Sequence, residues 1–174
     1  MITIVVGTNR INSVSRQVAN YYQSIIQEKG ITAEIVDLVD LPHDFTGTAL
    51  YENNGNNAIF NTMRDKVQSA KKLIFIVPEY NGSFPGILKT FIDGLKYPQG
   101  VRDKKAALVG ISSGVQGGVF AMSHLTDIFN YLGMHVFALK PKLAGIESNF
   151  SNGKVTNQLY NELINTQIEK FIEF

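Results

Sequence analysis

The sequence contains no cysteine among its 174 residues. This absence excludes disulfide bonds, thiol nucleophiles, CxxC redox pairs and cysteine-ligated metals, so any redox chemistry would need a cofactor. An excess of charge of one sign is also absent, because 16 basic residues nearly balance 15 acidic residues and leave a formal net charge of +1. We therefore expect no nucleic-acid partner and no attraction to an anionic membrane, and any anion site must be local.

Long apolar segments are absent as well. Met1 is followed at once by the short apolar run Ile2–Val6, without a basic leader, so we expect neither a signal peptide nor a membrane span, and hence a cytoplasmic location. The three histidines, at positions 43, 124 and 135, have no spacing that forms a metal site. We therefore expect no bound metal.

What the sequence does contain is a regular alternation of two patterns. Its length and its 44% hydrophobic content suit one compact domain spanning residues 1–174. Short apolar runs bounded by turn residues predict five strands. These runs are Ile2–Val6, Ala33–Val36, Leu73–Val77, Ala106–Ile111 and His135–Leu139.

Apolar residues at helical spacing fill the segments between these strands. A first helix is expected after Ser13, a plausible N-cap, and before Gly30. Further helices are indicated around Phe60–Ala70, from Pro85 to Leu95, and around Leu125–Leu132. A last helix is expected over roughly residues 156–172.

This strand–helix alternation predicts a doubly wound α/β fold. Nearly continuous apolar strands are typical of a parallel sheet covered by helices on both faces, which makes a three-layer α/β/α sandwich. With five strands we expect the order 2-1-3-4-5. Residues 40–57 lack clear periodicity and are long for a connection, so we interpret them as a functional or a mobile loop.

In such a sheet, ligands bind beyond the carboxyl ends of strands one and three. The loop after strand one carries one cation, Arg10, and hydroxyls at Thr8, Ser13 and Ser15, just before a helix N-terminus. This combination suits a phosphate group. It is equally compatible with a turn that ends in a helix cap and leaves the arginine solvated.

The loop after strand three reads PEYNGSFPG, residues 78–86. Pro78 has no amide hydrogen and constrains the exit of the strand, whereas Asn81 and Gly82 can adopt turn conformations that direct backbone groups inward. Tyr80 supplies an aromatic face and Glu79 a hydrogen-bond acceptor. These residues can contact a flat polar ring, although a tyrosine in this position also serves packing or the surface.

Other ligand-binding classes lack their motifs in this chain. The loop after strand one contains neither GxxxxGK[ST] nor GxGxxG, which argues against a nucleotide kinase and a dinucleotide-binding Rossmann domain. Clustered carboxylates, which a magnesium-binding receiver domain needs, are missing after Val6. Glycines at 114, 117 and 118 after strand four permit close backbone approach, but they are also consistent with a simple connection.

Two motifs together resemble those of the NADPH-dependent FMN reductases of flavodoxin-like fold, a family that includes quinone, azo and chromate reductases. The segment GTNRINSVS, residues 7–15, is similar to the family's G-S-x-R-x-x-S-x-N phosphate loop. The segment PEYNGSFPG matches its second signature, and SSGVQGG, residues 112–118, resembles its third loop. Thr8 replaces the usual serine and keeps the hydroxyl, whereas Ser15 replaces an asparagine and loses an amide donor.

The resemblance implies a set of FMN-binding residues in three groups. Around the phosphate it implies Thr8, Arg10, Ser13 and Ser15; along the isoalloxazine ring Pro78, Glu79, Tyr80, Asn81 and Gly82; at the far ring edge Ser112 and Gly114. No catalytic side chain is implied, because the flavin performs the hydride transfer.

The implied activity is an oxidoreductase that transfers a hydride from NADPH, or NADH, to bound FMN and then reduces a second small molecule. Free flavin, a quinone, an azo compound or a metal oxyanion could be that acceptor. The alternative is a flavodoxin-type electron carrier without NAD(P)H turnover, which the near-neutral charge disfavours. Family members form homodimers or homotetramers, so the resemblance also implies self-association.

Overall fold

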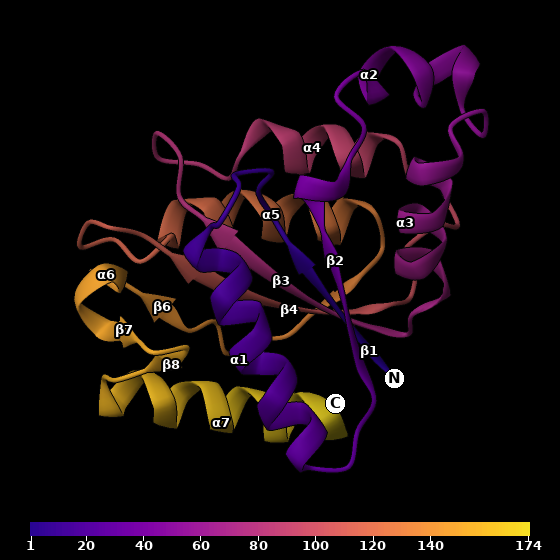
Figure 1. Cartoon of the computed structure of the whole chain (residues 1–174). Helices are drawn as coiled ribbons and strands as arrows, with labels where there is room; N and C mark the ends of the chain where they lie inside the picture. Colours follow the sequence, from indigo (N-terminus) through magenta and orange to yellow (C-terminus); the bar gives the residue numbers. More distant parts are fainter.

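A computed structural model describes residues 1–174 and contains one main parallel sheet with the strand order β2-β1-β3-β4-β5 (Figure 1). A sixth strand, β6, also pairs with β4, and β7 and β8 form a separate antiparallel hairpin. The strands are β1 (Ile2–Val6), β2 (Ala33–Asp37), β3 (Lys72–Pro78), β4 (Lys105–Ile111), β5 (His135–Val136), β6 (Lys142–Leu143), β7 (Phe150–Ser151) and β8 (Lys154–Val155).

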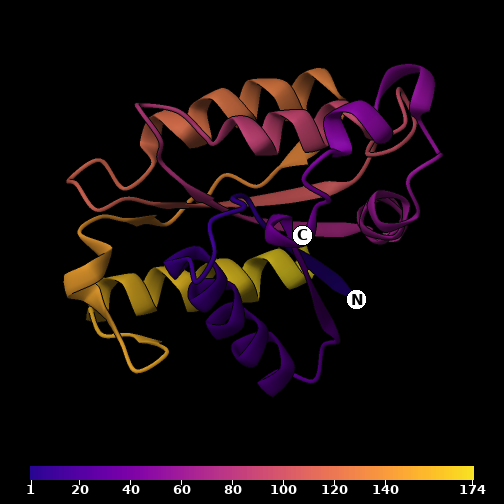
Figure 2. The same cartoon turned by 45° about the horizontal axis from the view of Figure 1, so that its top comes forward.

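Helices cover both faces of the main sheet (Figures 1 and 2). Helices α3, α4 and α5 pack on one face and helices α1 and α7 on the other, so that two separate apolar cores flank the strands. These helices are α1 (Val14–Glu28), α3 (Ala58–Ser69), α4 (Gly86–Asp93), α5 (Val119–Tyr131) and α7 (Gln158–Glu173). None of them combines the length and the apolar character that crossing a bilayer requires. The predicted α/β/α layering and strand order are confirmed.

The first crossover begins and ends at the predicted residues. The Ser13 hydroxyl accepts a hydrogen bond from the backbone N–H of Arg16 at 3.1 Å, which caps the first turn of α1. Gly30 follows the helix with φ of 75°, in the left-handed region that glycine adopts without a steric cost. Local sequence chemistry therefore defines α1, and it places the loop before α1 at the end of β1.

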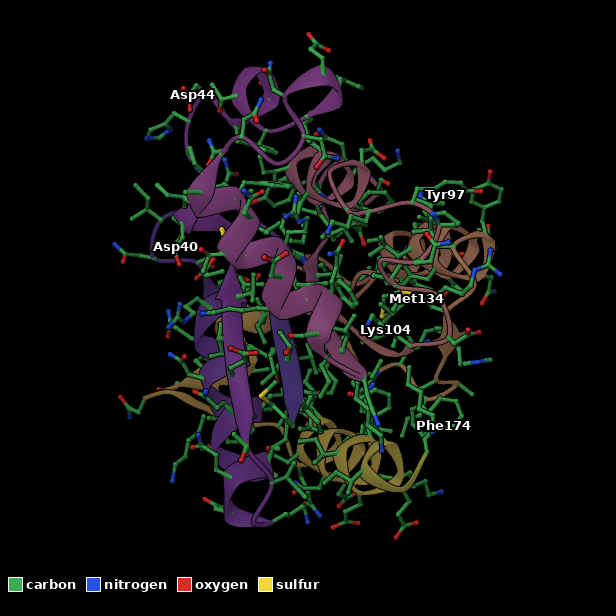
Figure 3. The ribbon with its side chains drawn as sticks, turned by 90° about the vertical axis from the view of Figure 1, so that its right-hand side faces the viewer. Asp40, Asp44, Tyr97, Lys104, Met134 and Phe174 are labelled. Carbon is green, nitrogen blue, oxygen red and sulfur yellow. The ribbon has the colours of Figure 1, made fainter.

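The segment predicted as a functional or mobile loop, residues 40–57, folds over the edge of α3 and α4. It contains the short helix α2 (Phe45–Thr48) and the 3₁₀ turn η2 (Tyr51–Asn53), and it follows the 3₁₀ turn η1 (Leu38–Asp40). Asp40 and Asp44 mark its beginning in Figure 3. The ring of Phe45 is buried and stacks on Phe60 of α3 with 5.8 Å between centroids. Apolar anchors thus hold this segment on the core.

The predicted fifth strand, His135–Leu139, is wrong in its extent. Only β5 pairs with the start of β4; the chain then leaves the ladder and returns as β6, which pairs with the end of β4. Pro141, which has no N–H to donate, lies in the gap, and its carbonyl accepts from the Gly110 N–H at 2.9 Å. The apolar residues of this run predict a strand, but nothing in their pattern indicates that the strand is interrupted.

The gap exposes a carbonyl of β4 to the interior, and a buried side chain from α7 satisfies it. Gln167 is fully buried, and its amide donates to the carbonyls of Leu108 and Leu139 at 3.0 and 2.8 Å. Its own carbonyl accepts from the Tyr22 hydroxyl of α1 at 3.0 Å. Burial is the main reason that the pKa of Tyr22 is raised well above its ordinary value. One polar side chain on α7 therefore connects α1, β4 and the stretch between β5 and β6.

Replacing Gln167 with leucine should destabilise the protein by about 2–4 kcal/mol, because several buried polar groups would lose their partners at once. The measurement is the free energy of unfolding in urea. Gln158→Leu is the matched control, since Gln158 lies exposed on the same helix and its side chain hydrogen-bonds only to Glu162. Equal stability of the two variants would contradict the role of Gln167.

Candidate functional site

The parallel register brings three loops together at one edge of the sheet. Val6, the last residue of β1, pairs with Ile76 of β3, and Pro78 at the end of β3 pairs with Ile111 at the end of β4. The segments that follow β1, β3 and β4 consequently lie side by side (Figure 1). This is the edge at which the sequence predicts a ligand.

An open cavity of about 270 Å³ lies between these loops. Most of the predicted site residues line it: Thr8, Arg10, Ser13, Ser15, Pro78, Glu79, Tyr80 and Ser112. Asn81, Gly82 and Gly114 belong to the same loops but do not line this cavity. Residues from three distant parts of the chain therefore converge on one hollow.

Hydroxyl groups form one wall of the cavity. Thr8, Ser13 and Ser15 are nearly buried as residues, with at most 6% of their surface exposed. The Thr8 hydroxyl lies 2.9 Å from the Tyr80 hydroxyl, and it also accepts from the backbone N–H of Arg10 at 3.2 Å. The loop after β1 is thereby tied to the loop after β3. Ser13 caps α1, so the capping interpretation of this loop holds for that residue.

Two arginines lie near the start of α1, and only one is free for a ligand. Arg16 forms an ion pair with Asp37 at 3.1 Å, and Asp37 is 4% exposed. Arg10 takes part in none of the chain's ion pairs and lines the cavity. The positive charge available to an anion in this cavity therefore comes from Arg10.

The loop after β3 forms a tight two-residue hairpin at Asn81 and Gly82. Their φ angles are 52° and 74°, and Tyr80 and Ser83 exchange both backbone hydrogen bonds, at 2.8 and 3.1 Å. Asn-Gly is the sequence that this turn, with φ above zero at both central residues, favours. The Ser83 hydroxyl also lies 2.9 Å from Nδ1 of His124 on α5, which supports the hairpin from outside.

The loop after β4 uses its glycines mainly to pack against the chain itself. A Cβ atom on Gly118 would lie 2.8 Å from the Cα of Gly110, and one on Gly117 would lie 2.8 Å from the Cβ of Lys142. The Ser112 hydroxyl accepts from the Gly117 N–H at 2.8 Å and donates to the Gly114 carbonyl at 2.7 Å. Gly114 itself faces open space, so it is the glycine of this set that a ligand can approach.

One polar atom at the cavity lacks a partner. Oε2 of Glu79 is buried and makes no hydrogen bond within the chain. A buried carboxylate oxygen is costly without a donor, so this atom indicates that a group from outside the chain completes the site. Glu79 was predicted as an acceptor from its position in the loop.

Sequence reasoning missed three polar residues that line the cavity: Asn12, Ser113 and Glu147. Asn12, with φ of 54°, lies inside the predicted phosphate loop, and Ser113 lies inside the third motif, so both positions carried a signal. Glu147 carried none, because it lies on the short helix α6 (Ile146–Asn149), far along the chain from the other loops. The hydrogen bond from Ser113 is the largest of the causes that lower the pKa of Glu147 from its ordinary value.

No group of three or more histidine and carboxylate side chains in the chain is arranged to hold a metal ion.

Comparison with known proteins identifies relatives of this chain. The family of NADPH-dependent FMN reductases matches residues 1–140. A 2-hydroxy-1,4-benzoquinone reductase from Burkholderia sp is 27% identical over an alignment 179 residues long, which covers 98% of this chain and 93% of that protein. An FMN-dependent NADPH-azoreductase from Staphylococcus aureus is 31% identical over 157 residues, covering 87% of this chain and 79% of that protein.

A similar architecture is found among solved structures. The flavoenzyme NAD(P)H:(acceptor) oxidoreductase FerB from Paracoccus denitrificans has a TM-score of 0.77 and 23% sequence identity, covering 99% of this chain and 94% of that chain. This likeness agrees with the order of the sheet and with the helices on both of its faces. The sequence match over most of the chain then makes it a member of the NADPH-dependent FMN reductase family.

Proposed function

We propose that the protein is an NAD(P)H-dependent oxidoreductase that binds FMN in the cavity between the loops after β1, β3 and β4. The observation that carries this proposal is the convergence, in one hollow, of buried hydroxyls, an unpaired arginine and a buried unpartnered carboxylate oxygen. An anionic group and an N–H donor are both needed to satisfy these residues. FMN offers both, through its phosphate and its ring.

Thr8, Arg10, Ser13 and Ser15 form the proposed phosphate end of the site. Hydroxyl donors and backbone amides before a helix N-terminus favour an anion, and the guanidinium of Arg10 adds a charge-assisted contact. Ser13 caps α1 with its hydroxyl oxygen, but the hydroxyl hydrogen remains available to donate. The residues present therefore fit a phosphate group.

Pro78, Glu79, Tyr80, Asn81 and Gly82 form the proposed ring end. The free Oε2 of Glu79 can accept from a ring N–H, which fits an isoalloxazine better than a purely apolar ligand. The rigid Asn-Gly hairpin holds its backbone groups in place. Ser112 and Gly114, on the loop after β4, are the proposed contacts at the far ring edge.

The chemistry that bound FMN supplies is acceptance of a hydride from NADPH, or NADH, and its delivery to a second acceptor. The chain's own residues hold and orient the ring, and we assign no catalytic side chain. Relatives named as a quinone reductase and an azoreductase support quinones and azo compounds as acceptor classes for this protein. Free flavin and metal oxyanions stay open as further acceptors.

The visible absorption spectrum of the purified protein with added FMN tests this function. Anaerobic addition of NADPH should bleach the bound flavin band rapidly, and a quinone added afterwards should restore it. NADH in place of NADPH gives the cofactor preference. A bound band that neither nucleotide changes would instead support an electron carrier, and the absence of any bound band would contradict FMN binding.

Replacing Asn81 with valine should reduce FMN occupancy, because a β-branched residue is strained at positive φ and would distort the hairpin under the proposed ring. The expected cost in folding free energy is about 1–2 kcal/mol, measured by urea unfolding, with occupancy measured by the flavin absorbance of the purified protein.

A matched control lies in the β7–β8 hairpin. Asn152 and Gly153 have φ of 50° and 75° and join the paired β7 and β8, so that they form the same kind of Asn-Gly turn. Asn152→Val should therefore cost similar stability without changing occupancy. Equal flavin occupancy in the two variants would remove the Asn81 hairpin from the site.

We further propose that the chain forms a homodimer or homotetramer through the face formed by α4 and α5. These helices lie beside each other (Figure 2) and, with the loop after α4, line a groove of about 590 Å³. Tyr97 and Tyr131 on this groove are 69% and 77% exposed, and Figure 3 shows Tyr97 at the surface beside α5. Exposed apolar groups of this kind favour a protein contact.

The charges of the groove suit a second copy of the same chain. Lys89 and Asp93 form an ion pair within the chain at 2.8 Å, and Lys96 and Asp127 lie on the same groove. The groove therefore carries charges of both signs and can be complementary to itself across a two-fold axis. A partner whose surface carries charges of only one sign would not be complementary to this groove. Apolar tyrosines among balanced charges thus support self-association.

Sedimentation velocity should show a species larger than a monomer, and Tyr131→Glu should shift it toward the monomer, because the interface would bury an unpaired charge. Tyr51→Glu is the control, since Tyr51 is 80% exposed and lies on η2, outside the groove. A wild-type monomer at all concentrations would contradict this proposal.

A further inference from the structure

Glu147 is held at the rim of the cavity by backbone pairing with the end of β4 and the loop that follows. β6 pairs with Gly110 and Ile111, and directly after it the Gly145 and Ile146 N–H groups donate to the carbonyls of Gly114 and Ser112 at 3.0 and 3.1 Å. The Ile146 side chain is 2% exposed and anchors α6 in the core. The position of Glu147 is therefore fixed by its neighbours and does not depend on its own side chain.

The carboxylate of Glu147 shares the cavity with the proposed phosphate residues. It accepts a hydrogen bond from the Ser113 hydroxyl at 2.5 Å and lines the same hollow as Arg10, Ser13 and Ser15. The Ser113 hydrogen bond, the backbone N–H of Glu147 and the charge of Arg10, in that order, lower the pKa of this carboxyl. Glu147 is consequently negative at neutral pH.

The positive charge of Arg10 acts on Glu147, but the two side chains form no ion pair. No ion pair joins the two side chains, so their charged atoms are more than 4.0 Å apart. The guanidinium thus remains open to a ligand while a negative charge stays nearby. If Glu147 served only to hold α6 in place through Ser113, its negative charge would not be needed. Two backbone hydrogen bonds already hold α6, and a glutamine could accept from Ser113 equally well.

The charge has a direct consequence for a phosphate ligand. A phosphate monoester carries about −1.5 to −2 charges at pH 7, and charges in water interact over roughly a Debye length, about 8 Å at physiological salt. A carboxylate in the same small cavity therefore opposes the group that Arg10 attracts. The two side chains act on the phosphate with opposite sign.

We propose that Glu147 lowers the affinity of the site for FMN by opposing its phosphate, so that bound FMN leaves the site faster than it would without this charge. This inference rests on the proposed function, since it concerns the same site. Riboflavin has the same ring but no phosphate, so it lacks the negative charge that Glu147 opposes.

Titrations with FMN and with riboflavin, followed by quenching of flavin fluorescence at low ionic strength, test the proposal. Glu147→Gln keeps an acceptor for Ser113 and removes the charge. It should bind FMN about three- to tenfold more tightly, from the Coulomb energy of such charges across several ångströms of water-like medium, and release it more slowly on dilution. Its riboflavin affinity should stay unchanged, and the FMN gain should shrink at high salt.

Two further variants are compared with Glu147→Gln. Glu173→Gln removes an exposed carboxylate from the last turn of α7; the neighbouring Ile172 carbonyl is bonded to Lys72 at the start of β3, so this turn lies at the opposite edge of the sheet. Its FMN affinity should equal that of the wild type. Arg10→Ala should bind FMN about ten- to hundredfold more weakly, because it loses a charge-assisted contact, with little effect on riboflavin.

The outcomes separate the inference from the function on which it rests. Unchanged FMN affinity in Glu147→Gln would overturn the inference, and so would an equal gain for riboflavin. Weaker FMN binding would overturn it too, since Glu147 would then be orienting Arg10. A wild-type protein that binds no FMN would contradict the proposed function itself.

Discussion

The parallel register of β1, β3 and β4 is the constraint on which the site depends. Because Val6 pairs with Ile76 and Pro78 pairs with Ile111, the three strands end at one edge, and the loops that follow them cannot lie apart. The Thr8–Tyr80 contact then joins two of these loops directly. A slip of one residue in either ladder would turn the buried side chains to the opposite face, so the two apolar cores that flank the sheet also protect the geometry of the cavity.

Much of this fold can be predicted from the sequence, because its signals are local. The caps at Ser13 and Gly30, the apolar strands and the helical spacing all act within a few residues. The division of the fifth strand could not be predicted in this way. It depends on the fit between Pro141, the unpaired carbonyl of Leu108 and the amide of Gln167, and these groups meet only in the folded chain.

The same distinction applies to the cavity. Thr8, Arg10 and Glu79 lie in motifs after strands, where topology alone predicts a ligand. Glu147 lies on α6, which reaches the rim only because β6 returns to β4. No local pattern around Glu147 indicates a role in binding. The motifs thus predicted Thr8, Arg10 and Glu79 as cavity residues and gave no sign of Glu147.

The interruption between β5 and β6 also determines how the sheet meets other molecules. A long straight edge strand presents a row of free backbone groups onto which another chain can add a strand, and this is a common route to aggregation. Here that edge is divided into two segments of two residues each, separated by a proline-containing stretch. A strand from another chain could not form a continuous row of backbone hydrogen bonds along this edge. The break therefore makes the edge a poor template for uncontrolled growth of the sheet.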